Sequence, residues 1–132
     1  MSHVIRALIV EDTPIAQVIA RKHMEAQGCE VEIAADGTSA LEKAMQTQYD
    51  VILMDIGLGD GPDGFEVARQ IKSQSNPNMA TLIAALTSHS SPEDIEQAMQ
   101  AGMEKYYSKP FRSEDSKELV DYVKEKLNAN GS

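Results

Sequence analysis

Hydrophobic positions along the chain follow two alternating patterns. Short runs of consecutive apolar residues predict buried strands, whereas apolar residues three or four positions apart predict helices packed on those strands. The two patterns alternate five times, and a helix follows each strand. The strands are expected at about residues 5–10, 30–34, 50–54, 81–86 and 105–108. This alternation is typical of an α/β protein with a parallel sheet covered by helices on both faces.

Capping residues predict where the helices begin. Thr13, followed by Pro14, is expected to cap the first helix, and Ser39 with Glu42 has the capping-box spacing for the second. Later helices are expected at about residues 65–73, from Ser91 to just before Gly102, and 113–127. The apolar positions expected to face the core are, in the first helix, Ile15, Val18, Ile19 and Ala26, and in the fourth, Ile95, Ala98 and Met99.

The composition of each strand predicts its place in the sheet. Residues 30–34 alternate polar and apolar side chains, as in an edge strand, whereas residues 81–86 are apolar on both faces and therefore central. With right-handed crossovers, these features favour a doubly wound five-stranded parallel sheet in the order 2-1-3-4-5. Strands one and three would then flank the point where such sheets bind ligands.

Each of four predicted strands ends in polar residues. Glu11 and Asp12 follow the first strand, Asp55 the third, Thr87 the fourth and Lys109 the fifth. Because parallel strands end at the same edge of a sheet, these side chains are expected to converge there. Two carboxylates on neighbouring strands repel each other unless a cation bridges them, and Mg²⁺ prefers such oxygen ligands.

The same residue types favour phosphoryl transfer to Asp55. An aspartate can form an acyl phosphate, and the transferred group needs positive charge around its oxygens. Lys109 is expected to pair with one oxygen and the Thr87 hydroxyl with another. The backbone carbonyl of Gly57 is an additional expected Mg²⁺ ligand, and Glu11 is expected to act through a metal-bound water.

The set Glu11-Asp12, Asp55, Thr87 and Lys109-Pro110 occurs in the order and spacing of a known family. From about Val4 to Leu127 the chain resembles a response-regulator receiver domain of the CheY-like superfamily, with a (βα)5 flavodoxin-like fold. The resemblance implies Mg²⁺-dependent transfer to Asp55 from a phosphohistidine on a histidine kinase or histidine phosphotransfer protein. It also implies that the domain catalyses only its own phosphorylation and dephosphorylation.

The resemblance further implies a switch. Thr87 would move toward the phosphoryl group, and Tyr106, three residues before the lysine, would rotate inward. The output face would comprise the fourth helix, the fifth strand and the fifth helix, and a weak homodimer through that face is possible.

Two positions depart from the family pattern. Gly59 stands four residues after Asp55, where the family usually has proline, and Gly64 comes one residue later than the usual glycine. The loop between them is therefore expected to be longer and more flexible. The Asp-Ile-Gly-Leu sequence at Asp55 resembles receivers of hybrid sensor histidine kinases. The chain is thus expected to be the C-terminal receiver of such a kinase, the alternative being a stand-alone single-domain response regulator.

Composition narrows the function classes further. The 132 residues suit one domain, at residues 4–127, with 128–132 as a disordered tail or a cloning remnant. A net charge of −9 argues against direct nucleic-acid binding. No apolar run is long enough to span a bilayer, so no membrane contact by this domain is expected. The single cysteine, Cys29, fits a reducing compartment, so a cytoplasmic location is expected.

Three other functions fit the sequence less well. A haloacid-dehalogenase-type phosphatase needs a second aspartate two residues after the first, where this chain has Gly57. A flavin-binding module needs a Ser- and Thr-rich phosphate loop after strand one, where Glu-Asp-Thr-Pro would repel phosphate. A degenerate receiver that only binds partners would not need the complete residue set.

Overall fold

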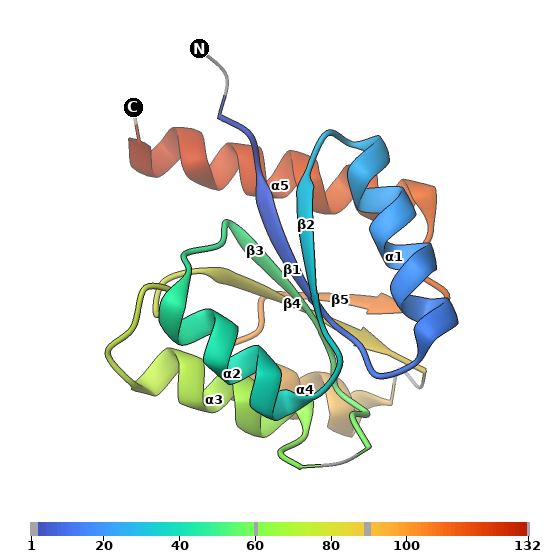
Figure 1. Ribbon diagram of the computed structural model, residues 1–132, viewed down its shortest axis with the longest axis vertical. Helices are drawn as coiled ribbons and strands as arrows, with labels where there is room; N and C mark the ends of the chain where they lie inside the picture. Colours follow the sequence, from blue (N-terminus) through green and yellow to red (C-terminus); the bar gives the residue numbers. More distant parts are fainter. Residues whose placement is uncertain (1–2, 60, 89–90, 132) are drawn as a thin grey trace.

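The computed structural model describes residues 3–59, 61–88 and 91–131. Strands and helices alternate throughout (Figure 1). The strands are β1 (Arg6–Val10), β2 (Glu30–Ala34), β3 (Val51–Asp55), β4 (Leu82–Thr87) and β5 (Lys105–Ser108). The helices are α1 (Pro14–Ala26), α2 (Gly37–Gln46), α3 (Gly64–Ser73), α4 (Pro92–Gln100) and α5 (Ser113–Gly131). In the part of the chain that is described, no helix is both long and apolar enough to cross a bilayer.

The sheet confirms the predicted topology. Its strands are parallel and lie in the order β2-β1-β3-β4-β5. Helices α1 and α5 cover one face, and α2, α3 and α4 cover the other (Figure 1). This is the doubly wound arrangement, in which the chain reverses its direction of travel across the sheet between β1 and β3.

Each central strand contributes side chains to two cores. On β1, Leu8 and Val10 pack with α2, α3 and α4, whereas Ala7 and Ile9 pack with α1 and α5. Strand β3 is buried at every position and divides its side chains in the same way. Because both faces are covered, these strands appear in the sequence as continuous apolar runs.

The inward faces of α1 and α4 were predicted incorrectly in part. Ile15 and Val18 are 70% and 64% exposed, and Ala26 is also exposed, whereas Ala20 and Met24 fill the core under α1. Ala20 and Met24 lie one turn apart on the buried side of the helix, so Ile15 and Val18, on the opposite side, face outward. On α4, likewise, Ala98 is buried but Met99 is 61% exposed.

Two helix ends also differ from the prediction. Helix α2 is capped by Asp36, whose carboxylate accepts the Ser39 N–H at 2.8 Å, so Ser39 is the third helical residue rather than the cap. At the other end of the chain, α5 continues through Gly131, where a tail from residue 128 was expected. No proline, and no glycine before Gly131, interrupts the helix there. Ser132 lies outside the described residues.

At the amino edge of the sheet, the buried side chain of Asn78 joins the loop before β4 to the segment that runs from the end of α2 to β3. Its Oδ1 accepts the N–H of Tyr49 at 2.7 Å, and its Nδ2 donates to the carbonyls of Ala44 and Thr47 at 2.6 and 2.7 Å. The Thr81 hydroxyl donates to the Tyr49 carbonyl at 3.0 Å and lies 3.0 Å from Asn78 Oδ1.

Replacing Asn78 by alanine is expected to lower the free energy of unfolding by about 3 kcal/mol, because an N–H and two carbonyls would lose their partner in the interior. Urea denaturation measures this change. Asn128→Ala, on the exposed side of α5, is the control and should change the free energy by less than about 0.5 kcal/mol. Equal unfolding midpoints for the two variants would contradict a structural role for Asn78.

Candidate functional site

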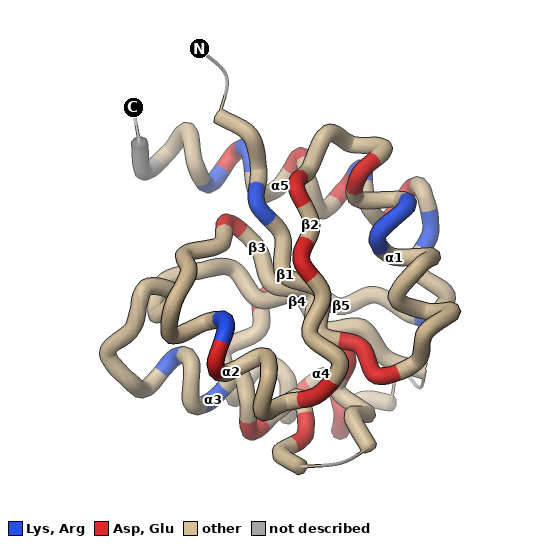
Figure 2. The backbone as a smooth tube through the Cα atoms, viewed as in Figure 1, with Lys and Arg blue, Asp and Glu red and all other residues tan. Residues whose placement is uncertain are grey.

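Strand register brings the predicted site residues to one edge of the sheet. Val10 is paired with Met54, which places Glu11 level with Asp55. Thr87 is paired with Ser108, and the N–H of Lys109 then donates to the Thr87 carbonyl at 2.8 Å. Acidic positions, drawn in red, lie around this edge (Figure 2). Glu11, Asp12 and Asp55 each present an oxygen within 4.8 Å of the others.

Lys109 lies between two buried carboxylates. Its Nζ is 2.7 Å from Glu11 Oε1 and 3.1 Å from Asp55 Oδ2. The Glu11 side chain is fully buried, and the Lys109 side chain is 21% exposed. The sequence predicted that Lys109 would approach Asp55, but it gave Glu11 a role through metal-bound water and did not anticipate its contact with the lysine.

This pairing changes the titration of both groups. Burial raises the pKa of Glu11, although the contacts with Lys109 and with the Thr13 N–H oppose that effect. Burial also disfavours the charged form of Lys109, but its contacts with Glu11 and Asp55 outweigh burial and raise the pKa of Lys109. The lysine therefore stays an ammonium at neutral pH, as stabilisation of a phosphoryl group requires.

Each of the three acidic residues also accepts one backbone N–H. Thr13 donates to Glu11 Oε2 at 2.9 Å, Gly57 to Asp55 Oδ1 at 2.8 Å, and Gly59 to Asp12 Oδ2 at 3.1 Å. A carboxylate has about four lone-pair positions, so these bonds orient the groups and leave positions open for a cation.

Gly64 packs directly against the backbone of the third strand. A Cβ at this position would meet the carbonyl oxygen of Asp55 and the Cα of Ile56. The glycine is thus required by close packing, although it lies one residue later than in the family pattern. The longer loop before it, described except at Asp60, still brings α3 against the end of β3.

A cavity of about 480 Å³ opens over these side chains. Its lining includes the expected residues Asp12, Asp55, Gly57, Thr87 and Lys109. Phe65, Ser88 and Asp94 line it as well, and no sequence motif pointed to Phe65 or Asp94. Tyr106 is half-buried and does not contribute to the lining; its hydroxyl donates to the Met103 carbonyl at 3.4 Å.

The residues present fit a divalent cation. Three carboxylates and one ammonium leave the cluster with two surplus negative charges when all are ionised. Among the described residues that line the cavity, the polar side-chain atoms are all oxygens apart from the Lys109 nitrogen. Mg²⁺ prefers oxygen ligands. Uncompensated negative charge is costly in a partly buried site, and a bound divalent cation would neutralise it.

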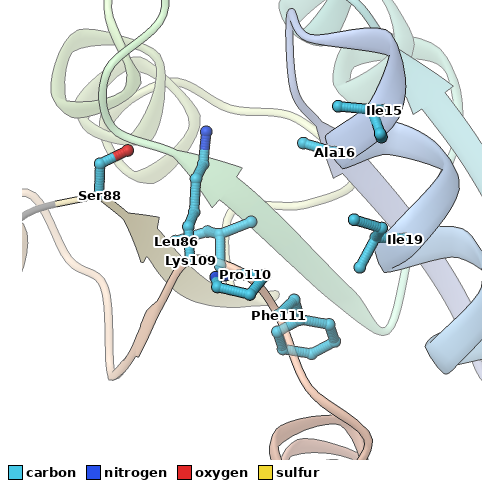
Figure 3. A pocket seen from close by; sticks show the side chains of 8 residues that line it. All are labelled: Ile15, Ala16, Ile19, Leu86, Ser88, Lys109, Pro110 and Phe111. Carbon is cyan, nitrogen blue, oxygen red and sulfur yellow. The ribbon is translucent and has the colours of Figure 1, made fainter.

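A second cavity, of about 300 Å³, lies beside the first (Figure 3). On α1, Ile15, Ala16 and Ile19 face Pro110 and Phe111 across it. The two cavities share Ser88 and Lys109 as lining residues. A largely apolar groove, with exposed aliphatic side chains on its rim, therefore leads directly to the acidic cluster.

Comparison with known proteins identifies the family. The family model "Response regulator receiver domain" matches residues 7–124. The chain belongs to this family. Receiver domains are phosphoacceptors rather than enzymes that turn over small molecules.

Individual relatives agree with this assignment. The chain is 34% identical over 131 residues to "Probable histidine kinase 2" of Oryza sativa subsp. indica, covering 88% of this chain and 12% of that protein. It is 35% identical over 122 residues to "Hybrid signal transduction histidine kinase L" of Dictyostelium discoideum, covering 87% of this chain and 7% of that protein. The receiver domain thus spans only a small part of these relatives.

A solved structure is similar along nearly its whole length. The receiver domain of sensor histidine kinase PA1611 from Pseudomonas aeruginosa PAO1 is 34% identical, with a TM-score of 0.79, and the match covers 93% of this chain and 97% of that one. That structure holds a magnesium ion coordinated in its active-site cleft. The fold and family predicted from the sequence are therefore confirmed.

Lys109→Met is expected to make stability depend on pH in metal-free buffer. Without the ammonium, the pKa of Glu11 should rise further, and a buried acid with a raised pKa destabilises the fold increasingly as pH rises from its unfolded-state pKa towards the raised value. Relative to wild type, the loss should be small near about pH 5 and reach about 3 kcal/mol near about pH 8.

Urea denaturation across that pH range checks this expectation. Adding Glu11→Gln to Lys109→Met should remove most of the pH dependence. Lys117→Met, on the exposed side of α5, is the matched control and should have little effect at any pH. A loss for Lys109→Met that is the same at both ends of the range would contradict the role given to Glu11.

Proposed function

We propose that this receiver domain accepts a phosphoryl group on Asp55 in a Mg²⁺-dependent step. The observation that carries the proposal is the position of the Lys109 Nζ, 3.1 Å from Asp55 Oδ2 at the wall of an open acidic cavity. The nucleophile and the cation that would stabilise the incoming group already lie together. Glu11, Asp12, Asp55 and the Gly57 carbonyl are the proposed metal-binding set.

In the proposed reaction, one Asp55 oxygen attacks the phosphorus of a phosphohistidine. The new O–P bond forms as the N–P bond breaks, and the electron pair stays on the histidine nitrogen. Asp55 loses its negative charge, so Lys109 becomes free to pair with a phosphoryl oxygen. Bound Mg²⁺ would supply further positive charge to the phosphoryl oxygens.

The acyl phosphate would return to the carboxylate by hydrolysis. Water attacks the phosphorus, the O–P bond to Asp55 breaks, and inorganic phosphate leaves. The domain would thus catalyse only its own phosphorylation and dephosphorylation. Thr87, at the cavity wall, is proposed to bond the phosphoryl group and to couple it to a rotation of Tyr106.

The phosphodonor is proposed to be a histidine kinase or a histidine phosphotransfer protein that docks on α1. Ile15 and Val18 expose large aliphatic side chains there, and the groove beside Ile15 shares Lys109 with the acidic cavity. A partner helix covering this patch would bring its phosphohistidine to Asp55. Burying such side chains against a partner is favourable by about 1.5–3 kcal/mol each.

We also propose which kind of parent protein carries this receiver domain. Histidine kinases among the relatives support a hybrid sensor kinase as the parent protein. A position near the C-terminus of that kinase and a cytoplasmic location are part of the proposal. A stand-alone response regulator is the alternative, and the flanking coding sequence distinguishes the two. The face formed by α4, β5 and α5 is the proposed output surface, with weak homodimerisation as one use of it.

Asp55→Asn is expected to abolish covalent phosphorylation by a small phosphodonor such as phosphoramidate, because an amide cannot form the acyl phosphate. Intact-protein mass spectrometry measures the added phosphoryl group. Asp63→Asn, at the exposed cap of α3, keeps its capping oxygen and should be phosphorylated like wild type. Undiminished phosphorylation of Asp55→Asn, or of wild type in excess chelator, would contradict the proposal.

Ile15→Ser combined with Val18→Ser is expected to slow transfer from a phosphorylated donor protein about tenfold or more, because apolar contact area is lost. Phosphorylation by phosphoramidate should not change, since that reagent needs no docking surface. Met99→Ser removes a similarly exposed apolar side chain from α4 and is the control. Equal transfer rates for the double variant and wild type would exclude docking on α1.

A further inference from the structure

Two backbone N–H groups of the loop after β3 donate hydrogen bonds to acidic side chains at the ends of β1 and β3. The Gly57 N–H donates to Asp55 at the end of β3, and the Gly59 N–H donates to Asp12, which follows β1. The second bond, at 3.1 Å, joins residues 47 positions apart in the sequence. It connects the loop to one proposed Mg²⁺ ligand, while the first connects it to another.

The bond to Asp12 depends on the residue type at position 59. Proline has no backbone N–H and cannot make it. A Cβ at this position would lie 3.2 Å from Asp12 Oδ2, which shows how closely the loop approaches the carboxylate. Glycine at position 59 therefore supplies a hydrogen-bond donor beside the acidic cluster that proline could not supply.

Without this bond, Asp12 would be poorly fixed. Its side chain is exposed, and its other described contact is the Thr13 hydroxyl at 3.4 Å from Oδ1. Glu11 and Asp55, by contrast, are buried and held by Lys109. The Gly59 N–H is therefore the best-placed group to orient the one exposed carboxylate of the cluster.

We propose that the backbone N–H of Gly59 positions Asp12 for Mg²⁺ binding. The inference rests on the proposed function, since it gives Asp12 the role of a metal ligand. Gly59 itself touches neither the metal nor the phosphoryl group. It fixes one carboxylate oxygen so that less conformational freedom is lost when the cation binds, as hydrogen-bonded partners of metal ligands do in other sites.

Two variants at position 59 separate the loss of the backbone N–H from the addition of a side chain. Gly59→Pro removes the donor and should weaken Mg²⁺ binding about three- to tenfold, the range for one charge-assisted hydrogen bond at an exposed carboxylate. Gly59→Ala keeps the donor, and Asp12 is exposed enough to shift slightly away from the new methyl group. Its Mg²⁺ affinity should stay within about twofold of wild type.

Isothermal titration with MgCl₂ measures these affinities, and circular dichroism confirms that both variants are folded. Equal dissociation constants for Gly59→Pro and Gly59→Ala would overturn the inference while leaving the proposed function intact. A wild-type protein that bound no Mg²⁺ would overturn both.

A second measurement needs neither a position-59 variant nor a metal. In metal-free protein, hydrogen exchange of the Gly59 amide proton, followed by NMR, should be several-fold faster in Asp12→Ala than in wild type, because its acceptor is gone. Exchange of the Gly57 amide, bonded to Asp55, should change little and serves as the internal control. An unchanged Gly59 exchange rate would overturn the inference even if Gly59→Pro failed to fold.

Discussion

The carboxyl edge of the sheet depends on the balance between its carboxylates and one ammonium. Parallel pairing of β1 with β3 places Glu11 and Asp55 at the same level, where their charges repel. Lys109 offsets part of that repulsion, and its position is fixed by the bond from its own N–H to the Thr87 carbonyl. The negative charge that remains is what a bound divalent cation would neutralise.

Much of this arrangement could be predicted from the sequence. Strands buried on both faces are continuous apolar runs, and in a parallel sheet the residues after them must lie along one edge. That reasoning placed Asp55, Thr87 and Lys109 together, as the structure does. It failed for the start of α2, where Asp36 and Ser39 both have capping chemistry. In the structure the two residues form one capping box with Asp36 as the cap, and Gly37, where an added Cβ would meet Pro62 and Val67, is the first helical residue.

The remaining errors have a common cause. An apolar stripe on a helix indicates a face that avoids water, but it does not say whether the protein's own core or another molecule covers it. Ile15 and Val18 fit a core-facing stripe in the sequence and are exposed in the structure. Contacts such as Glu11 with Lys109 and Gly59 with Asp12 depend on the path of loop backbone, which no residue pattern specifies.

The two ends of the sheet are held together by different kinds of interaction. At the amino end, neutral amide and hydroxyl groups around Asn78 form a buried network beside exposed ion pairs, whereas at the other end the charged groups of Glu11 and Asp55 are themselves buried. Because the hydrogen bonds of Asn78 join neutral groups, the frame that they give to the starts of β3 and β4 is little affected by salt. Natural sequence variation near Asn78 would accordingly alter how much folded protein a cell accumulates, while leaving the specific activity of each folded molecule unchanged.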